Sequence, residues 1–418
     1  MANVKPFKGL RANPDLVGKI AAPPYDVLDS DEARDVVHGN EYSFLHIGKP
    51  EVDLPKDVDL YDERVYQKAR ENFQSFIKKG WLVQDTKDCY YIYRQQMGEH
   101  VQIGIVAGAS VDDYENDIIK KHELTRKDKE DDRTKHVYTT KSQSGPVFLT
   151  YRADAKIDTL VADYMHSHQP VYSFQTTDRI IVDHTFWVVD ETEKIEALRS
   201  YFAVIPVLYV ADGHHRSAAA MRTRALMKAE NKNHTGNEEY NYFLSVIFPH
   251  NQMFIMDYNR IVKDLNGLSK DAFLKTIGEK YDIHEIGSTG KPYHPENVHD
   301  FGMYLDRKWY KISAKKGSFD EKDPIKSLDV SILQENLLSP VLGIGDPRTD
   351  KRINFVGGIR GLNELEKNVD SGKYAVAFAM HATTIEQLMA VADAGKIMPP
   401  KSTWFEPKLR DGLCTHMI

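Results

Sequence analysis

The fold prediction starts from residues 204–230, which read VIPVLYVADGHHRSAAAMRTRALMKAE. The apolar run Val204–Val210, rich in β-branched residues, predicts a buried strand. Ser217–Glu230 predicts a helix, because alanine, methionine, leucine, lysine and arginine dominate it and no helix breaker interrupts it. Gly213 allows a tight turn between the two elements. The stretch therefore predicts a strand–turn–helix unit with Asp212–Arg216 at its junction.

This junction is suited to binding an anion. The first amides of a helix have no partner within the helix, and the helix dipole adds partial positive charge there. Such helix N-termini bind phosphate readily. Arg216 can donate two parallel hydrogen bonds to phosphate oxygens, and His214 and His215 project from the same few residues. We therefore predict a phosphoryl-binding site at Asp212–Arg216.

Asp212 needs a different explanation, because a carboxylate repels a bare phosphate. We expect Asp212 to hold a divalent cation or to orient a histidine. The alternative is that Asp212 only caps the helix and that the two histidines pack inside the protein. Adjacent histidines point to different sides of a helix, so we do not expect His214 and His215 to bind one shared metal.

A second candidate lies in the charged segment Lys120–Lys141. A carboxylate at Glu123, beside His122, could accept a proton from a substrate hydroxyl. Thr125 and Asp128 are candidates to cap a helix that begins just after this pair. The alternative is that the whole segment is a solvated helix face, as Lys- and Glu-rich runs commonly are.

Two further motifs are open to more than one interpretation. In Pro23–Asp26 the prolines fix the backbone, and Asp26 either only caps or belongs to a site. Lys401–Thr403 is either part of a site or a structural latch for the C-terminus. Cys89 and Cys414 have no activating neighbours in the sequence, so we assign them no role.

Strand and helix patterns alternate throughout, which predicts a mixed α/β or α+β protein. We expect three regions, an N-terminal α/β region at 1–110, a phosphate-binding core at 111–263 and a C-terminal α/β region at 264–418. Two further helices are predicted, one at Glu63–Lys79 with Phe73, Phe76 and Ile77 on one face, and one that is capped by Thr383 and Glu386 and ends at Gly395. Two hairpins are predicted, Cys89–Gln96 with Val101–Ala109 around Gly98, and Tyr304–Leu305 with Trp309–Ile312. The other predicted strands are Val147–Tyr151, Thr185–Val189, Tyr242–Phe248, Ile353–Ile359 and Ala375–Ala382.

Composition narrows the class of protein. The chain has 418 residues, of which 41% are hydrophobic, enough for a sizeable core. Its net charge of −7 disfavours general nucleic-acid binding, which needs clustered cations. Two cysteines exclude a disulfide framework and favour a reducing compartment, so we expect a cytoplasmic protein. No stretch approaches the roughly 20 apolar residues that span a bilayer, so we expect no membrane partner.

At Asp212–Arg216 the sequence resembles the ParB/sulfiredoxin superfamily, whose members place a Gly-x-x-Arg frame on a helix N-terminus that binds nucleotide phosphates. Asp-Gly-His-His-Arg is similar to the motif of the free-serine kinases, which phosphorylate L-serine with ATP, ADP or, in some relatives, pyrophosphate. Those kinases carry an upstream His-Glu pair with the glutamate as general base, and His122-Glu123 matches it. Sulfiredoxin chemistry is not expected, because His214 stands where that enzyme needs a cysteine.

The whole chain also resembles a large bacterial family that shares this motif. The matching segments are Pro6–Leu10, Pro23–Asp26, His122–Thr125, Asp132-Arg133 and Met398–Thr403. The resemblances imply a ParB/sulfiredoxin-like core with large insertions, one of which separates Glu123 from Asp212. They also imply that Thr125 and Arg133 join Asp212–Arg216 in binding phosphate or nucleotide.

Together these observations predict a phosphotransferase that acts on a small hydroxyl compound, with free L-serine or phosphoserine as the best candidate. ATP, ADP or pyrophosphate is the expected donor, and Mg²⁺ is expected to bridge phosphate oxygens through Asp212. Glu123 is the expected general base, and His122, His215 and Arg216 complete the catalytic set.

Three alternatives stay open. In the first, the same groups transfer the phosphoryl group to water, and the protein is a small-molecule phosphatase. A ParB-like nucleotide-binding switch without turnover is the second alternative, although no basic DNA-recognition helix is evident. A non-catalytic regulatory protein on the same fold is the third.

Overall fold

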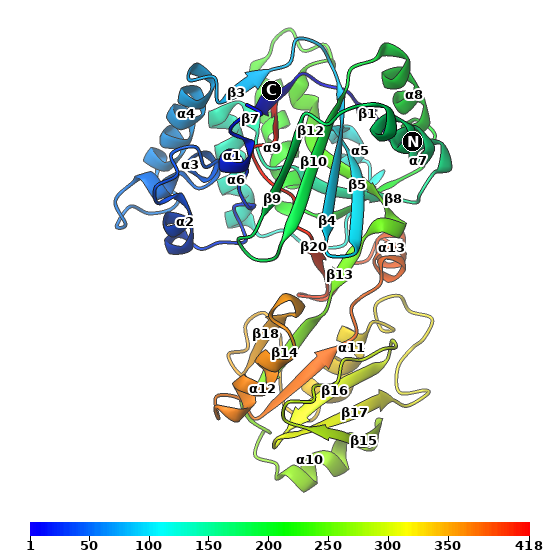
Figure 1. The fold of residues 1–418 in the computed structure, drawn as a ribbon. Helices are drawn as coiled ribbons and strands as arrows, with labels where there is room; N and C mark the ends of the chain where they lie inside the picture. Colours follow the sequence, from blue (N-terminus) through cyan, green and yellow to red (C-terminus); the bar gives the residue numbers. More distant parts are fainter. The chain divides into compact units, whose positions relative to one another are not determined.

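A computed structural model describes all 418 residues. Contacts within the chain divide it into two compact units (Figure 1), which we describe separately. The first unit comprises Met1–Met253 and Pro407–Ile418, and the second unit comprises Phe254–Glu406. This division differs from the expected regions 1–110, 111–263 and 264–418, because strands from the first two expected regions pair within one sheet.

The first unit is built on a nine-stranded sheet in the order β6-β11-β8-β12-β5-β4-β10-β9, with β1 paired to β5. The pairs β6–β11 and β8–β12 are parallel and the others are antiparallel, which makes the sheet mixed. The strands are β1 Val4–Lys5, β4 Tyr90–Met97, β5 His100–Ser110, β6 Ile119–Lys120, β8 Val147–Tyr151, β9 Tyr172–Thr176, β10 Val182–Val189, β11 Leu208–Asp212 and β12 Tyr242–Pro249.

Helices surround this sheet, with α2, α3 and α4 on one side of the first unit and α7 and α8 on the other in Figure 1. Helix α9 packs on α6, and α6 packs on α4. Apolar side chains of the sheet and of α7 and α8 form one continuous core. The helices are α1 Val17–Ile20, α2 Ser30–Val37, α3 Leu45–Gly48, α4 Glu63–Lys78, α5 Val111–Glu115, α6 Lys127–Thr140, α7 Ala155–Ser167, α8 Thr192–Phe202 and α9 His214–Glu230.

The C-terminal end of the chain lies in the first unit. Strand β21 pairs with β2 and β7 in a four-stranded sheet of order β3-β2-β21-β7. The strands of this sheet are β2 Gly9–Ala12, β3 Leu82–Gln84, β7 Ser142–Gln143 and β21 Cys414–Met417. Because β7 directly follows α6, this pairing holds the last residues close to the elements that carry the predicted site.

The second unit contains a six-stranded sheet of order β15-β17-β16-β19-β14-β18 and a two-stranded pair of β13 and β20. Its core centres on Tyr304 and Trp309, which are fully buried. Its elements are β13 Phe254–Met256, β14 Tyr258–Val262, α10 Lys270–Ile277, β15 Tyr281–Ser288, β16 Asp300–Leu305, β17 Lys308–Ala314, α11 Asp329–Leu333, β18 Ile353–Gly357, α12 Asn363–Asp370, β19 Val376–Met380, α13 Ile385–Asp393 and β20 Trp404–Glu406.

The expected mixed α/β class is confirmed, and most predicted elements are present within a few residues of their expected bounds. Three details were wrong. Ile77 is 38% exposed, although Phe73 and Phe76 on the same helix are buried. The strand before the motif begins at Leu208 rather than at Val204, which is 64% exposed.

The third correction concerns the cap of α13. The capping box is formed by Thr384 and Gln387, one residue later than the expected pair Thr383 and Glu386. Two consecutive threonines satisfy the same pattern, and Thr383 instead donates to the carbonyl of Ser402 at 2.8 Å. No helix of the structure combines the length and the apolar character needed to cross a membrane.

Candidate functional site

The predicted strand–turn–helix junction is present in the first unit. Strand β11 ends at Asp212, Gly213 has a φ of 101°, and α9 begins at His214. This left-handed backbone favours glycine, and a Cβ here would also lie 3.1 Å from the Nε of Arg216. Gly213 therefore occupies the N-cap position that the alternative interpretation gave to Asp212. The helical hydrogen bonds begin with Ser217 N to Gly213 O at 3.0 Å, so residues 214–216 present their amides outside the ladder.

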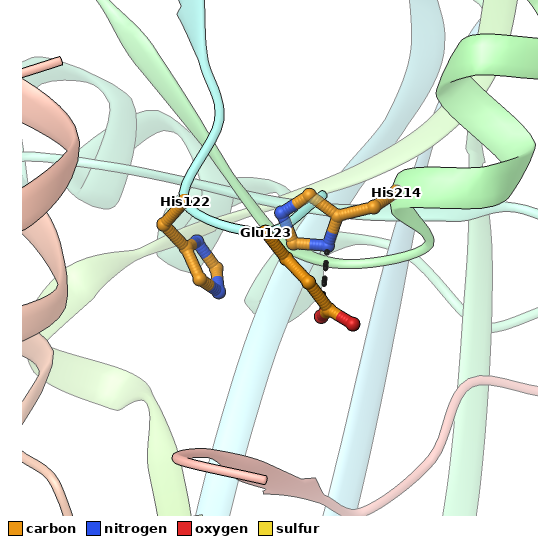
Figure 2. A group of neighbouring side chains, drawn as sticks. All are labelled: His122, Glu123 and His214. Carbon is orange, nitrogen blue, oxygen red and sulfur yellow. Dashed lines mark ion pairs between the residues drawn. The ribbon is translucent and has the colours of Figure 1, made fainter. Parts of the chain in front are cut away.

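The second candidate segment meets this junction. Strand β6 runs parallel to β11, with Ile119 opposite Leu208 and Lys120 opposite Tyr209. Since parallel neighbours end at the same edge of a sheet, the residues that follow β6 lie beside the residues that follow β11. Figure 2 shows the result, with His122 and Glu123 gathered around His214.

These three side chains are in close contact. The rings of His122 and His214 are nearly perpendicular, with centroids 4.5 Å apart. The Nδ1 of His214 lies 3.6 Å from the Oε2 of Glu123. The two histidines are buried, whereas the Glu123 side chain is 57% exposed. Of the expected site residues, His122, Glu123 and His214 therefore come together at the start of α9.

The histidines of the site carry little positive charge at neutral pH. Burial lowers the pKa of His122 to about 4. Burial and the neighbouring His122 ring hold the pKa of His214 well below its usual value. Burial also lowers the pKa of His215, which is half-buried. The imidazoles can therefore donate or accept hydrogen bonds, but they do not attract an anion by net charge.

Arg216 supplies the permanent positive charge of the junction. Its guanidinium is buried, donates from Nη1 to the carbonyl of Pro146, and lies 3.8 Å from the carboxylate of Asp212. Burial acts to lower the pKa of Arg216, but the carboxylates of Asp26, Asp212 and Asp411 together raise it above the ordinary value. Arg216 therefore stays charged in the interior of the unit.

Asp212, the residue expected to hold a metal, is paired with two cations in this structure. The Nζ of Lys408 lies 3.0 Å from its Oδ2, and Arg216 is the second partner. Burial acts to raise the pKa of Asp212, but the charges of Lys408 and Arg216 outweigh burial and lower it. Sequence analysis missed Lys408, because no local pattern connects it to the motif.

A small pocket of about 30 Å³ extends from Arg216. The Tyr25 ring and the Arg133 guanidinium stack at 4.1 Å, and Arg133 also donates from Nε to Asp132 at 2.8 Å. Burial raises the pKa of Asp411 to about 7, although Arg216 acts to lower it. The residues that line the pocket are Tyr25, Gly48, Arg133, His136, Val137, Gln143, Ser144, Gly145, Arg216, Ala219 and Asp411.

This pocket brings together motifs that are scattered along the sequence. Tyr25 comes from the Pro23–Asp26 segment, Arg133 from α6, and Asp411 from the segment before β21. Asp411 was missed by the sequence analysis, as Lys408 was. Both residues belong to a segment that returns to the first unit at the very end of the chain, so only the tertiary fold connects them to Arg216.

The start of α6 differs from the expectation. Arg126 occupies its N-cap without a side-chain cap, so neither Thr125 nor Asp128 caps the helix. Thr125 instead forms a hydrogen bond with Glu130. The Nε2 of His215 accepts a hydrogen bond from the Arg126 amide at 3.1 Å. His215 therefore tethers the beginning of α6 to the beginning of α9.

The Lys401–Thr403 motif lies in the second unit. Ser402 donates from Oγ to the carbonyl of Pro399 at 2.6 Å, and its own carbonyl accepts from Thr383. The carbonyl of Lys401 accepts from Arg260 at 3.0 Å. These contacts hold the segment within the second unit, and none of them involves the last residues of the chain, which belong to the first unit.

Comparison with known proteins identifies the family. The sequence profile of a family described as "Protein of unknown function (DUF1015)" matches residues 4–331. The chain belongs to the DUF1015 family. No curated protein matches this DUF1015 member.

Several solved structures are similar to this DUF1015 chain. A conserved hypothetical protein from Pyrococcus furiosus is 15% identical over 74% of this chain and 93% of that chain, with a TM-score of 0.33. A free serine kinase in complex with AMP is 13% identical over 72% and 86%, with a TM-score of 0.33. C-terminally truncated SbnI from Staphylococcus aureus is 10% identical over 73% and 85%, with a TM-score of 0.36. At these values we draw no conclusion about chemistry from the similarities.

Proposed function

We propose that this DUF1015 protein is a phosphotransferase that acts on a small hydroxyl metabolite. The observation that carries the proposal is the position of Glu123. Its carboxylate lies 3.6 Å from His214, at the helix N-terminus where the amides of residues 214–216 stand outside the helical ladder. A proton acceptor and an anion-binding helix end therefore share one corner of the first unit.

Phosphoryl transfer depends mainly on positioning and on stabilising charge, so few groups are needed. In the proposal the amides at the start of α9 hold the transferring phosphate, and the Arg216 guanidinium supplies positive charge. His214 and His215, both neutral, contribute hydrogen bonds. Arg133 and Thr125 bind further parts of the donor, Arg133 from the pocket that it shares with Arg216.

Glu123 is the proposed general base. Its side chain is 57% exposed, so an acceptor hydroxyl can approach it from solvent. A carboxylate within hydrogen-bond reach of that hydroxyl would remove its proton as the bond from the hydroxyl oxygen to phosphorus forms and the bond from phosphorus to the leaving ADP, AMP or phosphate breaks. His122, buried behind Glu123 against the His214 ring, would position the pair.

We propose ATP, ADP or pyrophosphate as donor, together with Mg²⁺, which would neutralise negative charge on the phosphate groups. Asp212 is the expected protein ligand of that Mg²⁺, but its carboxylate is paired with Lys408 at 3.0 Å. A cation would therefore reach Asp212 only if the ammonium of Lys408 moved to the phosphate oxygens. The donor would supply several negative charges with which the ammonium of Lys408 pairs in place of Asp212.

The acceptor in the proposal is free L-serine, with phosphoserine in the reverse direction. This choice follows the resemblance of Asp212–Arg216 and His122-Glu123 to the free-serine kinase motifs. A ParB/sulfiredoxin-like core and a cytoplasmic location belong to the same proposal. Both cysteines are free and buried, which suits a reducing compartment.

A phosphoryl-transfer screen tests the proposal. The full chain is incubated with ATP, ADP or pyrophosphate and Mg²⁺, with serine and related hydroxyl compounds as acceptors, in both directions. Phosphoserine formation that requires serine supports the proposal. Release of phosphate without an acceptor product would instead indicate the phosphatase, and nucleotide binding without any turnover would indicate the switch or regulatory alternative.

A further inference from the structure

We propose that His122, Glu123 and His214 form a binding site for Zn²⁺ or a similar divalent ion of the first transition series. The inference concerns the ion alone and does not depend on the proposed phosphotransferase activity. It assigns the protein a metal site at a position that differs from Asp212.

The geometry of the three side chains fits a single ion. One ligand atom from each residue can be chosen so that all lie within 4.8 Å of one another. Bonds of about 2.1 Å at tetrahedral angles place two ligands roughly 3.4 Å apart. The observed 3.6 Å between His214 Nδ1 and Glu123 Oε2 is close to this value. Figure 2 shows the two rings and the carboxylate facing a common space.

The buried nitrogens of the cluster have no hydrogen-bond partner. Both ring nitrogens of His122 and the Nε2 of His214 are unsatisfied, while the two residues are only 2% and 4% exposed. The Val210 carbonyl lies near the His122 ring but does not complete a hydrogen bond. Buried polar atoms are nearly always paired, because an unpaired one costs about 1–3 kcal/mol. A bound cation would supply the missing partner.

The ligands are held by ordered elements rather than by one mobile loop. His122 and Glu123 follow β6, whose parallel pairing with β11 fixes them beside the Gly213 turn. His214 is the first residue of α9, which packs against α6. Metal sites on such preorganised elements bind more tightly, because little ordering is needed when the ion arrives.

The donor set indicates which ions fit. Two imidazoles and one carboxylate suit Zn²⁺, Fe²⁺, Co²⁺ or Mn²⁺, whereas Mg²⁺ and Ca²⁺ prefer oxygen ligands alone. Three protein ligands leave at least one coordination position open, as catalytic zinc sites do. The Glu123 side chain is 57% exposed, so an ion can reach the cluster from solvent. With an ion bound, Glu123 is a ligand, so metal binding and phosphoryl transfer must be measured separately.

The test uses the tag-free full chain, stripped of metal by a chelator and titrated with Zn²⁺ in a calorimeter without any phosphate donor. We expect one Zn²⁺ per chain, and we expect millimolar Mg²⁺ not to displace it. Glu123→Gln and His214→Gln should each weaken Zn²⁺ binding by at least about tenfold. Even the loss of a residue that only hydrogen-bonds to a metal ligand commonly weakens metal affinity by about that factor. Titration with Co²⁺ adds a visible absorption band that reports nitrogen and carboxylate ligands.

His234→Gln is the matched control, because His234 also lies beside a glutamate, with 3.0 Å between its Nδ1 and Glu238, but has no second imidazole there. It should bind Zn²⁺ like the unaltered chain. Circular dichroism must show that each variant is folded. If the buried substitution His214→Gln unfolds the protein, Glu123→Gln still tests the site, because Glu123 is exposed and its replacement should not disturb the fold. Absence of stoichiometric Zn²⁺ binding, or equal weakening by all three variants, would overturn the site. Neither result would bear on phosphoryl transfer, which has its own assay.

Discussion

The ammonium of Lys408 lies 3.0 Å from the carboxylate of Asp212, although the two residues are 196 positions apart. Asp212 is the last residue of strand β11, at the candidate site. Lys408 belongs to the short segment, Pro407–Ile418, that returns to the first unit at the end of the chain. The pair therefore joins the C-terminal segment to the candidate phosphate-binding motif.

Replacement of Lys408 by Met should destabilise the first unit. Lys408→Met removes the closer cation from Asp212 and leaves that carboxylate with Arg216 alone. Both side chains of the pair are at most 29% exposed, so the pair is neither a surface pair nor a fully buried one. We therefore expect the substitution to lower the free energy of unfolding by about 1–3 kcal/mol, between the values for those two kinds of pair. Chemical unfolding followed by circular dichroism measures the loss.

Lys56→Met is the matched control for this prediction. Lys56 forms a pair with Asp31 at 2.6 Å, but both side chains are more than 70% exposed, so solvent screens the attraction. Its unfolding curve should stay close to that of the unaltered chain. If Lys408→Met and Lys56→Met behave alike, the contact with Asp212 does not stabilise the fold.

Glu123→Gln should abolish turnover while nucleotide binding stays nearly unchanged. The amide keeps the shape of the side chain but cannot accept a proton from a hydroxyl, and loss of a general base commonly lowers kcat by about 10²–10⁴-fold. Steady-state kinetics and equilibrium nucleotide binding separate the two effects. Glu115→Gln, at a half-exposed glutamate that pairs with Arg224, should keep full activity. Unchanged rates in Glu123→Gln would refute its role as base.

Arg216→Lys should weaken donor binding without unfolding the protein. Lysine keeps the positive charge between Asp212 and Asp411 but cannot donate two parallel hydrogen bonds to phosphate oxygens. Loss of a charged hydrogen bond of about 1.5–3 kcal/mol corresponds to roughly a 10–100-fold weaker affinity. Calorimetric titration with ATP, ADP and pyrophosphate measures it.

Arg222→Lys provides the comparison, since Arg222 lies on the same helix but pairs with Glu130 and Asp131. Its donor affinity should match that of the unaltered chain. Equal affinity in Arg216→Lys would mean that the guanidinium does not contact the donor and serves only the interior contacts with Pro146 and Asp212.

The sequence alone was sufficient to predict those structural features that depend on neighbouring residues in the chain. The apolar run before Asp212 and the alanine-rich helix after it predicted β11 and α9, and Gly98 marked the hairpin of β4 and β5 correctly. Errors of one to a few residues arose where a pattern was degenerate, as with the consecutive Thr383 and Thr384 at the start of α13.

Features that depend on tertiary contacts were not predictable in the same way. Nothing near Lys408 or Asp411 in the sequence connects either residue to Arg216, because strand pairing of β21 with β2 and β7 brings the segment back. The same limit applies to the packing of His122 against His214, which depends on the parallel alignment of β6 and β11. The burial that lowers the pKa of both histidines is likewise set by tertiary packing and cannot be inferred from the motif.

Asp411 gives the pocket beside Arg216 a charge that changes with pH. Burial raises the pKa of Asp411 to about 7, and Asp26 adds to this effect, while Arg216, Arg133 and Arg410 oppose it. His136, which also lines the pocket, has a pKa of about 4 and stays neutral above pH 6. Asp411 therefore changes from mostly neutral at pH 6 to mostly negative at pH 8.

Anion binding should weaken as the pH rises through 7. Deprotonation of Asp411 places a negative charge beside Arg216, and one such charge is worth at least about 1 kcal/mol, or about fivefold in affinity. Sulfate is the suitable probe, because its own charge does not change between pH 6 and pH 8. Asp411→Asn removes the titrating group and should flatten this dependence in calorimetric titrations at the two pH values. A flat profile in the unaltered chain, or an equal drop in Asp411→Asn, would contradict the assignment.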